Sequence, residues 1–229
     1  MTKLRMSWPN RITLGRILLT GPFVIAMLNI NEPAYKPWAR YGALAIFMVM
    51  ALSDALDGYL ARRKKSITLL GTFLDPLADK LLITCSCLLL ASKNTAVEGM
   101  ALPGWVVVII IGKDIYITLG FIVIYLVTSE MKIVPVKAGK ACTALQLSMV
   151  IAVLIWPEMG RLLPSFKYLI YFLWILVTVL AIVTVLIYTR NGTQYLNEFE
   201  QRLLAGRNNK NHADHNYSSE DRERSVNDS

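Results

Sequence analysis

Cysteine and histidine are scarce in this chain, which has three cysteines and two histidines among 229 residues. Cys85, Cys87 and Cys142 all lie in or beside apolar segments, and no histidine stands at a metal-ligand spacing from them. Small buried thiols are therefore expected, with neither a disulfide framework nor a metal site made of cysteine and histidine. His212 and His215 fall in a polar stretch near the end of the chain and are not expected to bind a metal.

Charged residues are also few, at 17% of the chain, whereas 55% of the residues are hydrophobic and the mean hydropathy is +0.46. This balance excludes a soluble globular domain and favours a polytopic membrane protein of one domain. The formal net charge is +8, but the positive charges flank apolar segments. Membrane orientation and lipid phosphate groups explain them better than nucleic acid does. The N-terminus lacks the pattern of a cleaved signal peptide, because Arg11 and Arg16 interrupt its approach.

Six apolar segments are each close to the ~20 residues that a helix needs to cross a bilayer. They cover residues 13–30, 37–60, 71–91, 103–127, 137–156 and 166–188. The expected fold is therefore an all-α integral membrane protein with six transmembrane helices, in which residues 157–165 form a turn before the last helix. An even number of spans places both termini on the same side of the membrane.

Lysine and arginine are distributed unequally over the two sides of this arrangement. Eleven lie on the side of the N-terminus, in residues 3–16, 62–65 and 132–140, against five on the opposite side. Cytoplasmic loops are enriched in these residues, so both termini are expected in the cytoplasm. The predicted location is the cell (inner, cytoplasmic) membrane, with multiple passes and with the acidic stretch described below facing the cytoplasm.

The composition changes from Asn191 onward, where polar and charged residues replace the apolar runs. Residues 1–190 are predicted to form the membrane domain. Residues 191–229 are predicted to form a polar tail that is largely disordered from about Gly206.

Four aspartates stand at the ends of two apolar segments. Asp54 and Asp57 are spaced i, i+3, and Asp75 and Asp79 are spaced i, i+4, so each pair lies on one face of its own helix. An aspartate at the centre of a membrane helix costs roughly 2.5–3.5 kcal/mol, so four of them require compensation. If the two faces meet, they form a cluster of carboxylate oxygens without histidine or cysteine, which suits Mg²⁺ or Mn²⁺.

The aspartates belong to the pattern D-x2-D-G-x2-A-R-x8-G-x3-D-x3-D, which has eight fixed positions within residues 54–79. The pattern resembles the signature of the CDP-alcohol phosphatidyltransferase family, membrane enzymes that make phospholipids from CDP-diacylglycerol. The resemblance implies that the four aspartates hold a pair of metal ions, that Asp79 is also the catalytic base, and that the protein is a homodimer. A carboxylate there is suited to accept the proton that an alcohol loses as it attacks the phosphorus and CMP leaves.

The same resemblance implies a binding site for the CDP part of the lipid. The implied positions are Asn10, Thr13, Gly58, Ala61, Arg62 and Thr68. Gly58 and Ala61 are small enough for a ligand to approach the helix closely, and the planar fork of Arg62 suits a phosphate. The segment Pro-Asn-Arg-Ile-Thr at residues 9–13 resembles the stretch that precedes the first span in the family.

Four lysines, Lys80, Lys113, Lys137 and Lys140, are candidates for contact with the acceptor alcohol. Lys113 and Asp114 lie inside the fourth segment, where a charged pair indicates function, although a structural ion pair is the rival interpretation. Lys80 directly follows Asp79 and would either balance the charge of the acidic cluster or meet the acceptor.

The fifth segment opens with a second resemblance. Residues 139–146 match the G-K-x-x-T-x-x-Q stretch of phosphatidylglycerophosphate synthases and of eukaryotic-type cardiolipin synthases. Lys140 would then bind the phosphate of the acceptor, with Lys113 and Lys137 near it. Lysines that extend to the cytoplasmic interface are the alternative for Lys137 and Lys140.

The expected reaction transfers the phosphatidyl group of CDP-diacylglycerol to glycerol 3-phosphate, which gives phosphatidylglycerophosphate. Phosphatidylglycerol, the acceptor of cardiolipin synthases, is the main alternative, ahead of inositol phosphate and serine. Bacterial phosphatidylglycerophosphate synthases often have Arg-Glu where this chain has Lys113-Asp114. A divalent-cation transporter is an alternative of another class, but transport needs acids along a route through the membrane, whereas these acids gather at one face. A non-catalytic lipid-binding protein would release no CMP.

Overall fold

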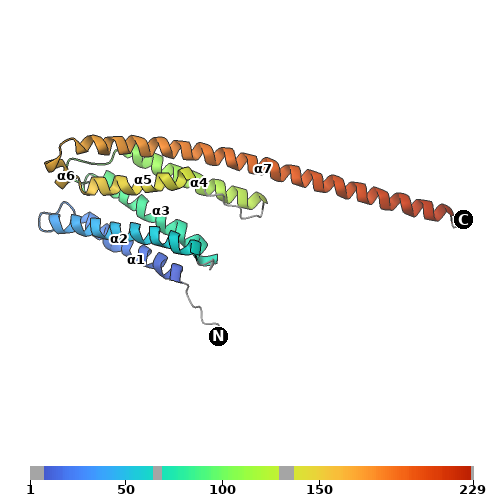
Figure 1. The fold of residues 1–229 in the computed structure, drawn as a ribbon, viewed down its shortest axis with the longest axis horizontal. Helices are drawn as coiled ribbons and strands as arrows, with labels where there is room; N and C mark the ends of the chain where they lie inside the picture. Colours follow the sequence, from blue (N-terminus) through green and yellow to red (C-terminus); the bar gives the residue numbers. More distant parts are fainter. Residues whose placement is uncertain (1–7, 64–68, 129–136, 228–229) are drawn as a thin grey trace, which may run out of the picture. The chain divides into compact units, whose positions relative to one another are not determined.

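The computed structural model describes the backbone of residues 8–63, 69–128 and 137–227. Side chains are described for residues 14–35, 38–53, 80–124, 126–128, 138–202 and 204. Within these ranges every regular element is a helix and there are no strands, which confirms the all-α prediction (Figure 1). The helices are α1 (Trp8–Leu28), α2 (Lys36–Arg63), α3 (Leu69–Ala91), α4 (Gly104–Thr128), α5 (Lys137–Leu154), α6 (Trp156–Leu162) and α7 (Phe166–Asn227).

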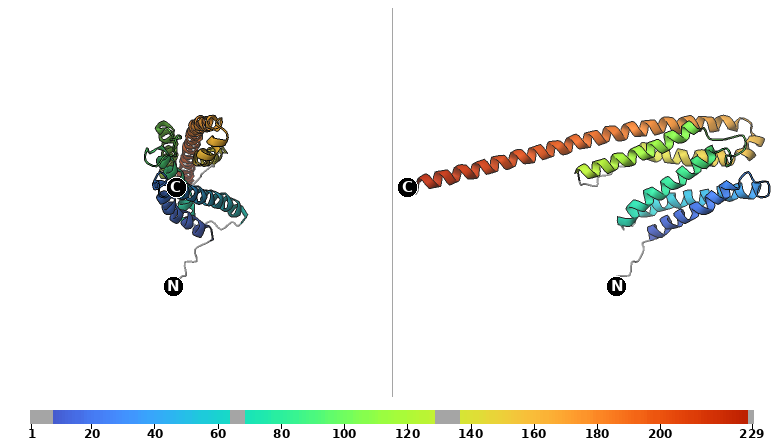
Figure 2. Two further views of the ribbon diagram at one scale, coloured as in Figure 1. Left: turned by 90° about the vertical axis from the view of Figure 1, so that its left-hand side faces the viewer. Right: turned by 180° about the vertical axis from the view of Figure 1, so that it is seen from behind.

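Helix α1 packs against both α2 and α3, as Figure 2 shows from two sides. Phe23 and Met27 of α1 are fully buried, as are Phe47 of α2 and Leu90 of α3. The ring centroids of Phe23 and Phe47 lie 5.9 Å apart, within the range of a favourable aromatic pair. The buried positions of α1 recur at helical spacing, so one face of α1 fixes the faces that α2 and α3 turn inward.

Helix α5 completes this core. It packs against α2 and α3, and its buried residues Met149, Val150 and Val153 join the same apolar cluster. The helix then bends by 68° at Ile155 into the short α6. The bend replaces the turn predicted for residues 157–165, and Pro157 fits it because proline is tolerated in the first turn of a helix.

At one end of the core, hydrogen bonds join two loops to each other, and polar contacts join α2 to α6. Asn31 donates hydrogen bonds from Nδ2 to the carbonyl oxygens of Asn94 (2.9 Å) and Ala96 (3.0 Å). Glu158 of α6 forms an ion pair with Arg40 of α2 and accepts a 2.8 Å hydrogen bond from the Tyr41 hydroxyl. These contacts hold the first turns of α2 against α6, far along the chain from the acidic end of α2.

Breaking the ion pair is expected to destabilise the fold measurably. The Arg40 side chain is only 13% exposed and that of Glu158 34%, so Arg40→Ala leaves a half-buried carboxylate without its cation. We expect a loss of about 1–3 kcal/mol, seen as a lower melting temperature in detergent. Arg161→Ala, which removes an exposed arginine from the same short helix, is the matched control and is expected to leave the melting temperature unchanged. Equal melting temperatures for Arg40→Ala and the wild type would contradict this assignment.

Two helices are long and apolar enough to cross a membrane on length and composition alone. They are α4, with a mean hydropathy of 2.2, and residues Phe166–Arg202 of α7, with 2.8. The bent pair of α5 and α6 supplies a third if it counts as one span. Shorter apolar helical stretches at Leu14–Leu28, Trp38–Ser53 and Lys80–Ala91 fall within the first three predicted spans. The described residues therefore belong to an all-α membrane protein with two or three spans of full length.

Helix α7 continues to Asn227, beyond the predicted domain boundary at residues 190–191 and beyond Gly206, where the sequence analysis expects a disordered tail. The chain has no proline after Pro164, so no residue in this stretch prevents a helix from continuing. The described residues 116–128 and 185–227 belong to a compact unit of their own. Within that unit the hydroxyl groups of Tyr116 and Thr189 share a 2.9 Å hydrogen bond.

Candidate active site

The four aspartates lie on two helices that share α1 as a neighbour. Asp54 and Asp57 are in α2, and Asp75 and Asp79 are in α3. Since both stretches are helical, the i, i+3 and i, i+4 spacings place each pair on one face, as predicted. The side chains of all four aspartates lie outside the described residues, so their directions stay a prediction.

The helix bounds place the two pairs at similar distances from the connection between α2 and α3. Asp57 precedes the end of α2 by six residues, and Asp75 follows the start of α3 by six, which is about 9 Å along each axis. The connection between Arg63 and Leu69 spans at most about 22 Å, so these two helix ends cannot lie far apart. The backbone geometry therefore allows both pairs of aspartates to contribute to a single site.

The positions predicted to bind the CDP group are described only in part. Asn10 and Thr13 lie in α1, and Gly58, Ala61 and Arg62 lie in the last turns of α2. Their side chains lie outside the described residues, and Thr68 falls wholly outside the described ranges. Their helices meet where α1 packs on α2, which brings the two predicted parts of the CDP site to neighbouring helices.

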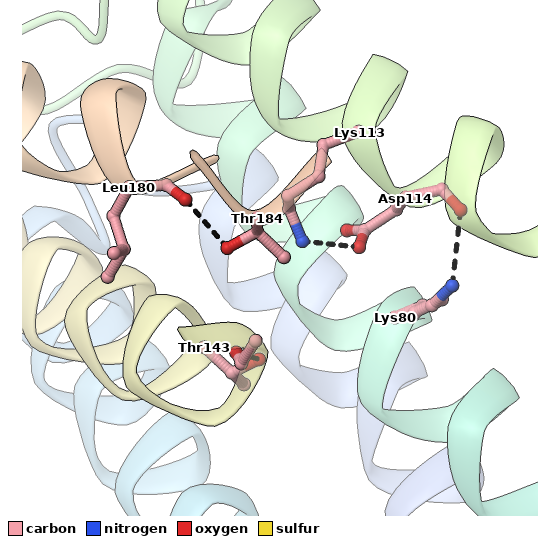
Figure 3. A network of polar contacts seen from close by, with 7 residues as sticks. Lys80, Lys113, Asp114, Thr143, Leu180 and Thr184 are labelled. Carbon is pink, nitrogen blue, oxygen red and sulfur yellow. Dashed lines mark hydrogen bonds and ion pairs between the residues drawn. The ribbon is translucent and has the colours of Figure 1, made fainter. Parts of the chain in front are cut away.

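A polar cluster follows Asp79 along α3. The Lys80 Nζ donates a 3.2 Å hydrogen bond to the main-chain carbonyl of Asp114 in α4 (Figure 3). The Lys113 Nζ forms a 2.6 Å ion pair with Oδ1 of Asp114. The side chain of Lys113 is 5% exposed and that of Asp114 15%, so this charged pair is almost removed from solvent. The structure thus contains the ion pair that the sequence left as one of two interpretations for Lys113.

The fifth-segment residues divide into exposed and buried positions. Lys140 is exposed on the first turns of α5, whereas Gln146 is 1% exposed. The Thr143 hydroxyl bonds the carbonyl of Gly139 within its own helix at 3.2 Å. Lys137 begins α5, and its side chain lies outside the described residues.

Sequence reasoning missed two buried polar residues, one in α7 and one in α1. Thr184 of α7 is fully buried, and its hydroxyl donates a 2.6 Å hydrogen bond to the carbonyl of Leu180 (Figure 3). Arg16 of α1 is 5% exposed, although the sequence analysis counted it only as an orienting charge. The signal for Arg16 was its place inside an apolar run, where a buried arginine is expensive without function.

Among the side chains that the structure describes, no three histidine, cysteine, aspartate or glutamate residues lie close enough to hold a metal ion. The four aspartates of α2 and α3 lie outside that search. Their donor chemistry, four carboxylates on two helices, fits Mg²⁺ or Mn²⁺.

These features define an all-helical membrane protein with charged groups buried among apolar helices. A profile of the family described as CDP-alcohol phosphatidyltransferase matches residues 6–187, most of the chain. The chain therefore belongs to the CDP-alcohol phosphatidyltransferase family, a family of phospholipid-synthesising transferases, as the motif predicted.

Individual relatives are similar over shorter stretches. A CDP-diacylglycerol--glycerol-3-phosphate 3-phosphatidyltransferase of Bacillus subtilis (strain 168) is 35% identical over 118 residues, covering 48% of this chain and 58% of the relative. A chloroplastic protein of the same name from Oryza sativa subsp. japonica is 34% identical over 169 residues, covering 68% of this chain and 48% of the relative. A cardiolipin synthase (CMP-forming) of the same plant is 32% identical over 114 residues, covering 48% of this chain and 33% of the relative. The matches span about half the length of these relatives or less.

Proposed function

We propose that the protein transfers the phosphatidyl group of CDP-diacylglycerol to glycerol 3-phosphate, releasing CMP and forming phosphatidylglycerophosphate. The observation that carries the proposal is the complete acidic signature on α2 and α3, in a chain that belongs to this family. The names of the Bacillus subtilis and rice relatives support glycerol 3-phosphate as the acceptor.

Asp54, Asp57, Asp75 and Asp79 are the residues proposed to hold two Mg²⁺ or Mn²⁺ ions. When bound, such ions supply neutralisation of the diphosphate charge and make CMP a better leaving group. Asp79 additionally accepts the proton of the attacking hydroxyl. Arg62 binds a phosphate oxygen of the CDP group, and the small Gly58 allows the nucleotide to approach α2.

The acceptor site is proposed at the first turns of α5. Lys140 is exposed there, so its ammonium is accessible to a soluble phosphomonoester. Lys137 lies one turn earlier. The third lysine predicted for this role, Lys113 of α4, is instead engaged in a buried ion pair with Asp114. Phosphatidylglycerol is the second candidate acceptor, because a rice relative is named as a cardiolipin synthase.

Lys140→Ala is expected to raise the KM for glycerol 3-phosphate by about 10-fold, because one charge-assisted hydrogen bond to the phosphate is lost. The KM for CDP-diacylglycerol should change by less than about 2-fold, since the nucleotide site is assigned to other helices. Initial rates of CMP release at varied concentrations of each substrate measure both constants.

Lys93→Ala is the matched control for that experiment, because it removes an exposed lysine from the loop between α3 and α4. It is expected to change neither constant. If Lys140→Ala moves only the KM for CDP-diacylglycerol, then Lys140 is misassigned.

The membrane arrangement is part of the same proposal. Helix α1 has 21 residues, α2 has 28 and α3 has 23, each long enough to cross the ~30 Å hydrocarbon core. With α4, the bent pair α5 and α6, and the apolar part of α7, this gives six spans. Both termini and the acidic ends of α2 and α3 then face the cytoplasm, as the lysine and arginine distribution indicates. A homodimer in the inner (cytoplasmic) membrane is expected from the family resemblance.

The direct test is CMP release by the purified protein in detergent. We expect release that requires a divalent cation, CDP-diacylglycerol and an added alcohol together. Uptake of Mg²⁺ or Mn²⁺ into proteoliposomes without CMP release would favour the transporter instead.

A further inference from the structure

Three charged groups join α3 to α4 immediately after the candidate base. The Lys80 ammonium reaches the Asp114 carbonyl at 3.2 Å, and the Lys113 ammonium reaches the Asp114 carboxylate at 2.6 Å (Figure 3). Asp114 therefore accepts one ammonium at its main-chain carbonyl and the other at its carboxylate, and the two lysines come from different helices.

Because this cluster is buried, removal of any one of its charged side chains is expected to disturb its geometry. Lys113 is 5% exposed, so it has little water to replace Asp114 as a partner. Removing one member of a buried pair leaves an uncompensated charge, whereas removing both members together is much less disruptive. This asymmetry makes the cluster suitable for a double-mutant cycle.

The cluster directly follows the acidic residues along α3, so its contacts can affect the position of those residues. Beyond Lys80, α3 is fixed by its buried residues Leu82, Ile83 and Cys87. Before Lys80, α3 continues to Leu69 and carries Asp75 and Asp79. Close backbone packing joins α3 to α1 and α5 within the described residues. At the height of Lys80, a long side chain connects it to α4.

We propose that Lys80, Lys113 and Asp114, here named the α3–α4 bridge, are positioning residues that set the rotation and height of the acidic end of α3. The bridge acts through Asp79, the neighbour of Lys80, and thereby on the metal ligands. This inference rests on the proposed function. It assigns Lys113 to alignment of the metal-binding helix rather than to contact with the acceptor phosphate.

The inference is tested with Lys113→Met, Asp114→Asn and the double variant that carries both changes. Each single variant is expected to lower kcat about 10-fold and to raise the half-saturating Mg²⁺ concentration about 10-fold. The KM for glycerol 3-phosphate should stay within about 2-fold of the wild type. The double variant should recover most of the loss, because both charges of the buried Lys113–Asp114 pair are removed together, and Lys113→Arg should retain nearly full activity.

Lys80→Met supplies an independent arm, because it removes the bond to the main-chain carbonyl and leaves the Lys113–Asp114 pair intact. It is expected to raise the half-saturating Mg²⁺ concentration, as Lys113→Met and Asp114→Asn do. Lys93→Met, an exposed lysine of the following loop, is the matched control and should not change it.

Two results would overturn the inference while leaving the proposed function standing. One is a Lys113→Met protein with a raised KM for glycerol 3-phosphate and unchanged metal dependence, which would make Lys113 an acceptor-binding residue. The other is a set of variants with lower melting temperatures but wild-type kcat and metal dependence, which would make the bridge purely structural. A wild-type protein that releases no CMP under any condition would overturn the proposed function, and this inference with it.

Discussion

Asp79→Asn is expected to reduce CMP release by roughly 10²–10⁴-fold, the range that general base catalysis contributes. Asparagine has nearly the same shape as aspartate, but its amide cannot accept the proton of the attacking hydroxyl. It also removes one of the four carboxylates proposed to bind metal, so excess Mg²⁺ or Mn²⁺ should not restore the rate. Turnover under saturating substrates and metal is the measurement.

Folding is the necessary control for that variant. The melting temperature in detergent should stay close to that of the wild type, because Asp79 is proposed for chemistry rather than for packing. Glu32→Gln removes an exposed carboxylate from the loop after α1 and should keep full activity. An Asp79→Asn protein that releases CMP at the wild-type rate would refute the assignment of the base.

Removal of divalent cations is expected to have an effect of similar size. Dialysis against EDTA should lower CMP release by roughly 10³-fold or more, because stabilisation of the phosphate charge by metal ions is worth several kcal/mol. Mg²⁺ or Mn²⁺ should restore the rate, since both prefer the carboxylate oxygens that this chain supplies. The rate as a function of free metal concentration is the measurement.

The same assay distinguishes the effect of the four aspartates on metal dependence from the effect of other carboxylates. Asp57→Asn should shift the metal titration to higher concentration, whereas Glu32→Gln should leave it unchanged. Full activity in EDTA, or a titration that Asp57→Asn does not move, would contradict the metal assignment.

The sequence predicted the long helices well, because their apolar runs are bounded by recognisable breaks. The predicted segment 103–127 matches α4 at Gly104–Thr128, and α7 begins at Phe166, where the last segment was predicted to begin. The short α6 was missed because Pro157, which usually marks a turn, is also acceptable in the first turn of a helix. The continuation of α7 was missed because polar composition indicates disorder while the absence of proline permits a helix.

The candidate site was predictable only where its residues are close in sequence. The spacing of Asp54 and Asp57, and of Asp75 and Asp79, placed each pair on one helical face. Their similar distances from the connection between α2 and α3 required the helix bounds of the structure. Whether two faces meet depends on how α2 and α3 pack on α1 through residues such as Phe23 and Phe47, which no local pattern encodes.

The α3–α4 bridge is a second case in which local sequence patterns do not predict a contact between distant residues. Periodicity identified Lys113 and Asp114 as an unusual pair and left their role open between acceptor binding and a structural ion pair. It could not place Lys80 of α3 near them, because this contact joins residues 34 positions apart in the chain.

The central claim is that this protein forms a phosphatidyl product on an alcohol with CMP as the leaving group. The most direct measurement incubates purified protein and Mg²⁺ with labelled CDP-diacylglycerol and one of four acceptors, then identifies the product lipid by mass. The acceptors are glycerol 3-phosphate, phosphatidylglycerol, inositol phosphate and serine. We expect phosphatidylglycerophosphate from glycerol 3-phosphate, with equimolar CMP. Cardiolipin from phosphatidylglycerol alone would contradict the choice of acceptor, and no product with any of the four would contradict the account as a whole.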